Sequence, residues 1–170
     1  TGYYGGWGMV IVYENSKMKW RDITVFDGYA YVPPSTTTSE IINVEGFNAV
    51  QSGDVNLKLE LMAGEGDAYY TGDYFRMKRW NSNTYDNLSY TGGNTNNIST
   101  NFFNSAILTG GNTRNPNLNN NTGLDIVMFN VDNTGNRYIT NNQTSTSFRY
   151  GTTQDTYIIF NMTFAVDAYV

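Results

Sequence analysis

The last segment of the chain, DTYIIFNMTFAVDAYV (155–170), has apolar residues at every second position. A period of two predicts a β-strand, whose successive side chains point to opposite faces. We expect one face to lie in the core and the other to face solvent or a ligand, as in an antiparallel sheet packed on a second sheet. The core face would carry Thr156, Ile158, Phe160, Met162, Phe164 and Val166, and the opposite face Tyr157, Asn161, Thr163, Asp167 and Tyr169.

Further segments with strand-like patterns are separated by turn residues. Residues 8–14 (GMVIVYE) are apolar at nearly every position, which predicts a central strand that is buried on both faces or packed under a loop. Nowhere do apolar residues recur at helical spacing over three turns. The pattern predicts an all-β fold, an antiparallel β-sandwich that is jelly-roll-like and has almost no helix. The remaining predicted strands are 18–27, 56–64, 73–80, 101–108, 124–131 and 146–151.

Two Asn-rich tracts, 91–104 and 109–123, connect predicted strands. Core-like residues such as Phe102 and Phe103 interrupt the first tract. We therefore expect ordered loops in which Asn side chains satisfy turns, rather than disorder. The Pro-containing segment 31–40 (YVPPSTTTSE) predicts an exposed connection.

The length and composition of the chain limit its function. A chain of 170 residues has the size of one domain and can bury a core, so we expect a single β-sandwich domain over 1–170. The chain contains no cysteine and no histidine. Disulfides, thiolate nucleophiles, histidine general bases and histidine-ligated zinc are therefore excluded. We expect that the protein is not an enzyme.

The charge of the chain argues against two classes of partner. The formal net charge is −5, and an acidic chain without a basic stripe repels phosphate backbones, so we expect no nucleic-acid partner. No stretch approaches the roughly 18 consecutive apolar residues that a spanning helix needs, so we expect no membrane insertion. The abundance of Asn, Thr, Ser, Gly and Tyr is typical of exported bacterial β-proteins.

Acidic residues cluster in the segment GEGDAYYTGDYF (64–75), which places Glu65, Asp67 and Asp73 near one turn. Carboxylates and loop carbonyls are the ligands that Ca²⁺ prefers, so these three residues are candidate ligands of a structural Ca²⁺. Their spacing is not that of an EF-hand, and the alternative is that they are solvated turn residues. A glycosidase would need two paired carboxylates, and no motif pairs any acids of the chain.

Aromatic residues make up 15% of the chain, which is enough to suggest a binding surface. Exposed Trp and Tyr rings beside Asn and Asp can stack on sugar rings while the amides bind hydroxyl groups. The candidate ligand-binding residues are Trp80, Tyr69, Tyr70, Tyr85 and Tyr90. For each single aromatic residue the alternative is packing in the core or at an edge, which we expect for Trp7 and Trp20.

The segment GGWGMVIVYENSKMKWRDITVFDGY (5–29) resembles part of very large secreted surface proteins from gliding Bacteroidetes. These proteins include the SprB-like gliding motility adhesins, which the type IX secretion system exports. The resemblance implies a folded β-domain from a much larger extracellular protein at the cell surface, and it supplies no catalytic motif. Three downstream blocks resemble the same family in the same order: LKLELMAGEGDAYYTGDYF (57–75), TNFFNSAILTGGNTRNPNLNNNTGLDIVMFNV (100–131) and NNQTSTSFRYGTTQDTYIIFNMTFAVDAYV (141–170).

We therefore expect a non-catalytic module of a cell-surface adhesin that contributes to surface adhesion and gliding motility. Its expected partners are surface polymers or glycans and the neighbouring domains of the same chain. Two alternatives stay open, a lectin-like carbohydrate-binding module of a secreted protein and a structural spacer without a ligand. Weak binding by one domain would be strengthened through effective concentration when domains repeat along a filament.

Overall fold

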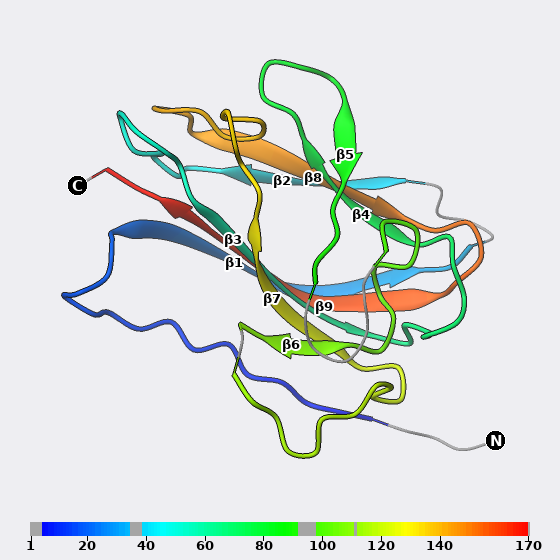
Figure 1. Cartoon of the computed structure of the whole chain (residues 1–170). Helices are drawn as coiled ribbons and strands as arrows, with labels where there is room; N and C mark the ends of the chain where they lie inside the picture. The colour runs from blue at the N-terminus through cyan, green and yellow to red at the C-terminus, as the bar shows by residue number, and fades with distance from the viewer. Residues whose placement is uncertain (1–4, 35–38, 92–97, 111, 170) are drawn as a thin grey trace.

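The computed structural model describes residues 5–34, 39–91, 98–110 and 112–169. This part of the chain forms two β-sheets that pack on each other, and it contains no helix (Figure 1). The predicted antiparallel β-sandwich with almost no helix is therefore confirmed. The finer prediction of a jelly-roll stays a prediction.

Strands that are distant in the sequence lie side by side in both sheets. Neighbouring strands are antiparallel, except that β6 and β7 are parallel. Within the described residues, the five-stranded sheet has the order β1 (Arg21–Val32), β9 (Tyr157–Asp167), β3 (Leu57–Gly64), β7 (Asp125–Val131) and β6 (Ile107–Thr109). The four-stranded sheet has the order β2 (Glu40–Glu45), β8 (Ser145–Gly151), β4 (Tyr74–Lys78) and β5 (Tyr85–Asn87).

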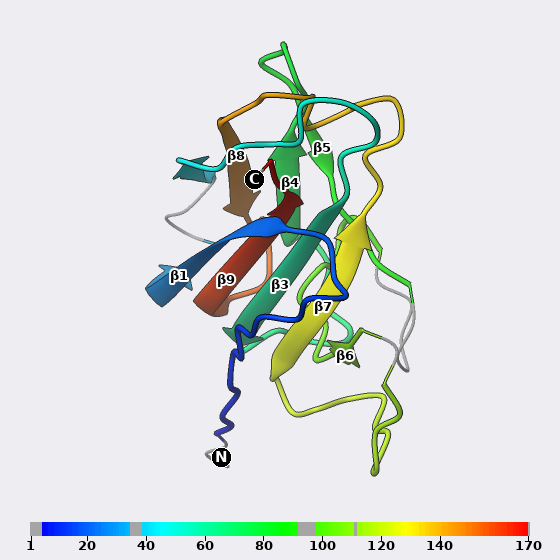
Figure 2. The same cartoon turned by 90° about the vertical axis from the view of Figure 1, so that its left-hand side faces the viewer.

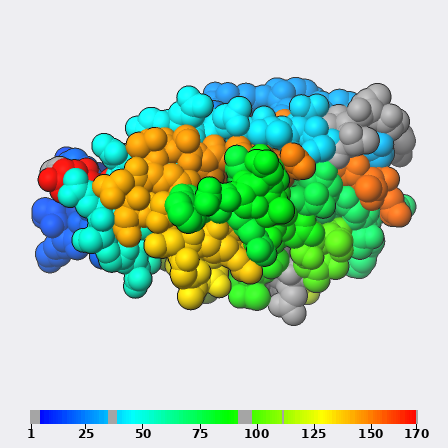
Figure 3. Space-filling model, turned by 90° about the horizontal axis from the view of Figure 1, so that it is seen from above, coloured from blue at the N-terminus to red at the C-terminus, as the bar shows by residue number. Residues whose placement is uncertain are grey.

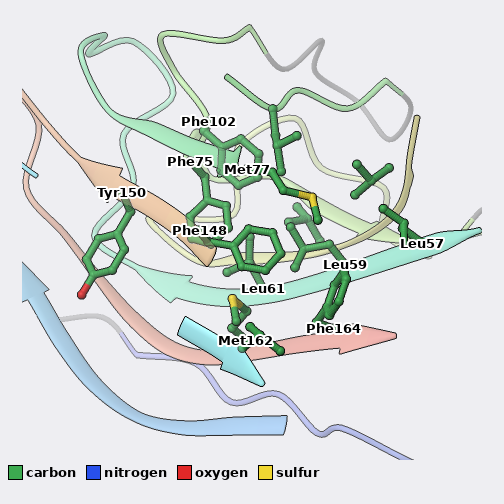
Figure 4. Close-up of a cluster of buried hydrophobic side chains, with 14 of the residues drawn as sticks. Leu57, Leu59, Leu61, Phe75, Met77, Phe102, Phe148, Tyr150, Met162 and Phe164 are labelled. Atoms are coloured by element: carbon green, nitrogen blue, oxygen red, sulfur yellow. The ribbon is translucent and has the colours of Figure 1, made fainter. Parts of the chain in front are cut away.

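The core lies between the two sheets and is filled by the inward side chains of both (Figure 4). On β3, Leu59 and Leu61 are fully buried and alternate with half-buried residues, as a strand with one core face requires. From the second sheet, Phe75 and Phe148 lie with their ring centres 5.5 Å apart, and Phe148 meets Phe164 of the first sheet at 5.4 Å. Such aromatic pairs add about 0.5–1.5 kcal/mol beyond the burial of their area, and the pair of Phe148 and Phe164 joins the two sheets.

β9 contains a β-bulge at Phe160. In the pairing of β9 with β3, Ile159 pairs with Ala63 and Asn161 pairs with Met62, so Phe160 is the extra residue. An extra residue shifts the alternation of side chains by one position. The two halves of β9 therefore present opposite sets of alternating residues to the core.

Because of this bulge, the predicted core face of β9 is correct in only one half of the strand. After the bulge, Met162 and Phe164 are buried as predicted. Before it, the prediction is wrong: Tyr157 and Ile159 are buried, and Phe160 itself is 37% exposed.

The prediction that the opposite face of β9 lies toward solvent or a ligand is also wrong, because Asn161, Thr163 and Asp167 are buried. β9 lies between β1 and β3, so side chains of two neighbouring strands flank its outward residues. Asp167 accepts hydrogen bonds from Arg21 Nε at 3.2 Å and from Asn56 Nδ2 at 2.6 Å, which compensate the burial of its charge. These contacts tie the start of β1 to the end of β9.

The prediction of a central buried strand over residues 8–14 is wrong. The segment forms no strand and crosses the outer face of the five-stranded sheet in front of β3 and β7 (Figure 2). It touches the sheet at Gly8, where a side chain would collide with Met62 and Ile126. Large side chains farther along the segment are 56–66% exposed: Met9, Ile11, Val12 and Tyr13.

The other predicted strands occur with shifted bounds. Segments 56–64 and 124–131 correspond to β3 and β7 within one residue at their starts, whereas only the end of 101–108 enters a strand, β6. β2 and β5 are strands that the pattern did not predict. β5 spans only three residues, and β2 begins at Glu40, the last residue of the Pro-containing segment.

The second Asn-rich tract supports the expectation of ordered loops with Asn side chains in turns. Asn121 Nδ2 donates a hydrogen bond to the Ser105 carbonyl at 2.6 Å, and Asn120 Oδ1 accepts one from the Thr122 N–H at 2.8 Å. Residues 92–97 of the first tract and residues 35–38 of the Pro-containing segment lie outside the described residues.

Candidate functional site

Three of the predicted ligand-binding aromatic residues are exposed, but the fold places them at opposite ends of β4. Tyr69 is 89% exposed and Tyr70 is 59% exposed, and both lie in the loop between β3 and β4. Trp80 is 50% exposed and lies in the turn between β4 and β5. Since β4 spans five residues, about 15 Å separates the two groups along the strand. They do not form one site.

The turn that carries Trp80 is fastened to its surroundings. The Trp80 backbone N–H donates a hydrogen bond to the Arg137 carbonyl at 3.0 Å. Asp86 on β5 accepts hydrogen bonds from Arg79 Nε at 2.8 and 2.9 Å and lies 3.4 Å from Arg137 Nε. The hydrogen bond from Arg79 holds the pKa of the Asp86 carboxyl below its usual range. Trp80 is therefore presented on an ordered turn.

Tyr90 is not available to a ligand, which corrects its assignment to the predicted binding group. The side chain is 3% exposed, and its ring centre lies 5.5 Å from that of Phe102 and 5.3 Å from that of Phe129. Its hydroxyl donates a hydrogen bond to the Phe102 carbonyl at 3.3 Å. A buried Tyr fills the core with its ring and satisfies its hydroxyl internally, which a sequence cannot distinguish from an exposed Tyr in a loop.

Tyr85 lies on the outer face of the four-stranded sheet. Its hydroxyl oxygen is 2.7 Å from Ser147 Oγ, so the side chain of a β5 residue reaches across β4 to β8. The Arg149 Cζ atom is 4.2 Å from the centre of the Tyr85 ring. At this distance the positive charge is attracted by the electron-rich face of the ring.

Sequence analysis missed the cationic residues beside Tyr85. The alternation in YFRMK buries Phe75 and Met77 and turns the intervening residues of β4 outward. This signal was present in the sequence, but only the pairing of β4 with β5 and β8 shows which residues join it. Figure 3 views the side of the molecule where β2, β8, β4 and β5 lie. The surface is named the basic face here and consists of Tyr74, Arg76, Lys78, Tyr85 and Arg149.

The three predicted calcium ligands have different surroundings. Glu65 and Asp67 are exposed in the loop between β3 and β4, whereas Asp73 is fully buried. Asp73 Oδ2 accepts a hydrogen bond from the Phe103 N–H at 2.6 Å, and Oδ1 has no hydrogen-bond partner in the described part of the chain. Burial raises the pKa of Asp73 to about 7, because the charged form loses its hydration.

Two further buried acids lie near Asp73, and sequence analysis did not identify them. Asp125 accepts hydrogen bonds of 2.9–3.2 Å from the backbone N–H groups of residues 104–106, and Asp155 accepts one of 3.1 Å from the Asp67 N–H. Burial raises the pKa of Asp125 despite these donors, and it raises that of Asp155 to about 6. The hydrogen bonds fasten neighbouring loops to the sandwich.

The arrangement of these acids suits a structural role. A carboxyl whose pKa lies near 7 has the value expected of a general acid or base, but Asp73 is enclosed by protein and cannot reach a substrate from its buried position. Within the described residues, no group of three or more acidic side chains is arranged to hold a metal ion. Binding of Ca²⁺ by Glu65, Asp67 and Asp73 stays a prediction.

Trp7 and Trp20 are exposed, which corrects the expectation that they pack in the core or at an edge. Trp7 is 83% exposed, and Trp20 is 55% exposed. Trp20 lines a surface hollow of about 410 Å³ together with Lys19, Asp54 and Asp167. The hollow offers an indole ring beside charged side chains, but it is open rather than enclosed.

Comparison of the chain with protein-family models, with curated protein sequences and with solved structures finds no match. In the residues that the structure describes, no helix has the length and apolar character needed to cross a membrane.

Proposed function

We propose that this chain is a non-catalytic module of a bacterial cell-surface adhesin, located outside the cell, that contributes to surface adhesion and gliding motility. The observation that carries the proposal is the exposure of all three tryptophans. Trp7, Trp20 and Trp80 are each at least half exposed, although Trp is one of the residues that gain most from burial. Exposed Trp and Tyr side chains are typical of interaction surfaces.

The distribution of the exposed rings supports contact with extended surfaces rather than with a small molecule. Small-molecule sites are concave and bury most of their ligand. Here Trp80 lies on the turn between β4 and β5, Tyr69 lies on the loop at the other end of β4, and Trp7 lies near the start of the chain. Contacts spread in this way are weak one by one, and they gain strength when several domains of one filament engage the same polymer.

The binding of surface polymers tests this proposal. The 170-residue chain is passed over neutral and acidic polysaccharides and over polystyrene, and its retention is measured by surface plasmon resonance. We expect measurable retention on at least one of these polymers. The Trp7→Ala, Trp20→Ala and Trp80→Ala variant should lose most of it, because Trp rings supply large apolar contact area with little loss of conformational freedom.

A matched control separates the aromatic rings from general apolar contact. Leu118 is 50% exposed, so Leu118→Ala removes an exposed apolar side chain without removing a ring. This variant should keep the retention of the original chain. Failure of the original chain to bind any of these surfaces at high protein concentration would contradict the proposal and favour a structural spacer.

A further inference from the structure

We propose that the basic face binds acidic polysaccharides, with the Arg and Lys side chains holding carboxylate or sulfate groups and the uncharged polar neighbours holding sugar hydroxyls. The inference rests on the proposed adhesive function and names the chemical class of ligand. Sequence composition argues against a nucleic-acid partner, so the positive charge on this one face calls for another explanation.

The register of the strands brings the cations together. Arg149 on β8 and Arg76 on β4 are direct partners in the pairing of these two strands, and Lys78 follows Arg76 on the same face. Adjacent strands are only about 4.8 Å apart, so like charges placed side by side repel each other and destabilise the sheet. A bound anion between them would remove this repulsion.

Among the described residues, no carboxylate forms an ion pair with a cation of the basic face, whereas four cations elsewhere are paired. In the described part of the chain, Lys19 and Arg21 pair with Asp167, while Arg79 and Arg137 pair with Asp86. No ion pair involves the three cations of the basic face, Arg76, Lys78 and Arg149, among the described residues.

Acids of the neighbouring strands are too far away or point elsewhere. Asp86 lies between two outward residues of β5, so its side chain points to the opposite side of the strand. On β2, Glu40 is the partner of the buried Tyr150, so its side chain points to the side opposite Arg149. Glu45 shares the outer face, but it is four residues from Ile41, the partner of Arg149, or about 13 Å. The basic face therefore has a local excess of positive charge on a chain whose net charge is −5.

Both guanidinium groups of the basic face are held in place by aromatic rings. The Cζ atom of Arg76 is 3.7 Å from the centre of the Tyr74 ring, and that of Arg149 is 4.2 Å from the centre of the Tyr85 ring. A stacked guanidinium keeps its planar set of donors for a carboxylate or sulfate and loses less conformational freedom on binding than a mobile one. The face is thus organised before a ligand arrives.

The Arg149 side chain also carries an unsatisfied donor, its Nε atom. It is shielded from solvent and has no hydrogen-bond partner among the described residues. A buried donor without an acceptor is costly, particularly on a charged group. Functional sites are places where such a cost is found in native proteins.

Uncharged polar residues surround the cations and favour a polysaccharide over other anions. Asn87 is exposed and accepts a hydrogen bond from Arg76 Nε at 2.5 Å, and Asn43 is exposed on β2. Ser147 is buried under the Tyr85 ring end, where its hydroxyl positions the Tyr85 hydroxyl at 2.7 Å. Asn43 is the partner of Ser147 on β2. Amide and hydroxyl groups can both donate to and accept from sugar hydroxyls. A polymer that alternates hydroxyls with acidic groups matches this arrangement.

A pair of polymers that differ only in charge tests the inference. Binding of the 170-residue chain is measured by surface plasmon resonance to polygalacturonate and to the same polymer after full methyl esterification. We expect the acidic form to bind at least about tenfold more tightly, because charge-assisted hydrogen bonds are stronger than neutral ones. Added salt should weaken this binding, since it screens the exposed charges.

Variants assign the binding to the basic face. Arg76→Gln and Arg149→Gln should each reduce the affinity for polygalacturonate about tenfold. Lys58→Gln is the matched control, because it removes one positive charge from β3 in the other sheet and should leave the affinity unchanged. Circular dichroism verifies that each variant keeps its β-structure.

The outcomes separate this inference from the proposed function. Equal binding of the acidic and esterified polymers would overturn the inference and leave the adhesive function standing, as would binding to neutral polymers alone. Equally tight binding to duplex DNA would overturn the assignment to polysaccharides. Loss of binding in Lys58→Gln as large as in Arg76→Gln would show that total charge, not this face, controls the interaction.

Discussion

Residues 8–14 and strand β9 are both rich in apolar, β-favouring residues, yet they have opposite environments. The first segment forms no strand and exposes most of its large side chains on the outer face of the five-stranded sheet. β9 is paired on both edges, with β1 and with β3, and is buried at nearly every position. Apolar composition alone therefore does not determine which segments of this chain are buried. Pairing with neighbouring strands distinguishes the buried β9 from the exposed residues 8–14.

The largest effect expected from this comparison concerns one methionine in each region. Met162 on β9 is 1% exposed, and Met9 is 65% exposed. Met162→Ala should lower the free energy of unfolding by about 2–5 kcal/mol, because it removes buried apolar atoms and leaves a cavity. Met9→Ala should change it by less than about 0.5 kcal/mol. Urea-induced unfolding, followed by circular dichroism, measures both values.

Equal effects of the two substitutions would contradict the difference in burial between residues 8–14 and β9. A loss of several kcal/mol for Met9→Ala would mean that residues 8–14 are packed in solution. The slope of the unfolding transition is the control, since an unchanged slope shows that the variants expose the same surface on unfolding.

The acids near the start of β9 give the next largest effect, which depends on pH. Burial raises the pKa of Asp73 to about 7 and that of Asp155 to about 6, from usual values of 3.8. Between about pH 4 and pH 7 the folded protein therefore binds more protons than the unfolded chain, so its stability falls as the pH rises. Asp73→Asn should remove roughly 2–3 kcal/mol of this fall, measured by urea unfolding at several pH values.

The exposed segment provides the control for this pH dependence. Glu14 is exposed at the end of residues 8–14, so Glu14→Gln should leave the pH dependence of stability as it is in the original chain. If the free energy of unfolding of the original chain does not change between pH 4 and pH 7, the pKa of Asp73 is not raised by burial.

The smallest expected effect follows from removing the exposed segment altogether. A chain without residues 1–14 should differ in free energy of unfolding by less than about 1 kcal/mol, because none of the described residues among them, 5–14, is buried. Removal of β9 should instead abolish cooperative unfolding, since β9 pairs with two strands of the core. Thermal unfolding monitored by circular dichroism compares the two truncations. If the chain without residues 1–14 fails to fold, the conclusion that residues 8–14 contribute little to stability is wrong.

The sequence predicted the fold class because most strands carry their own alternation. β3 and β7 illustrate this, since side chains alternate between the core and the outside along each strand, apart from the end of β7. The same pattern failed at β9, where a single extra residue, Phe160, reverses the two faces. A bulge arises from pairing with other strands, so the local pattern of one strand does not reveal it.

The sequence predicted individual features of the candidate sites but not their grouping. It identified Trp80, Tyr69 and Tyr70 as exposed rings, but strand length places them apart. It placed Tyr90 in the same group, although the loop that carries Tyr90 folds it against Phe102. The basic face required the register of three strands, which single-sequence patterns do not supply.

The position of β9 also sets the order in which this domain can assemble. β1 and β3 are synthesised long before β9, yet they do not touch along their edges, because β9 lies between them. During translation, the edges of β1 and β3 that later pair with β9 therefore have no partner strand. Long-range pairings of this kind form slowly. Folding of the five-stranded sheet is delayed until β9 has left the ribosome, and until then its apolar strands need protection from aggregation.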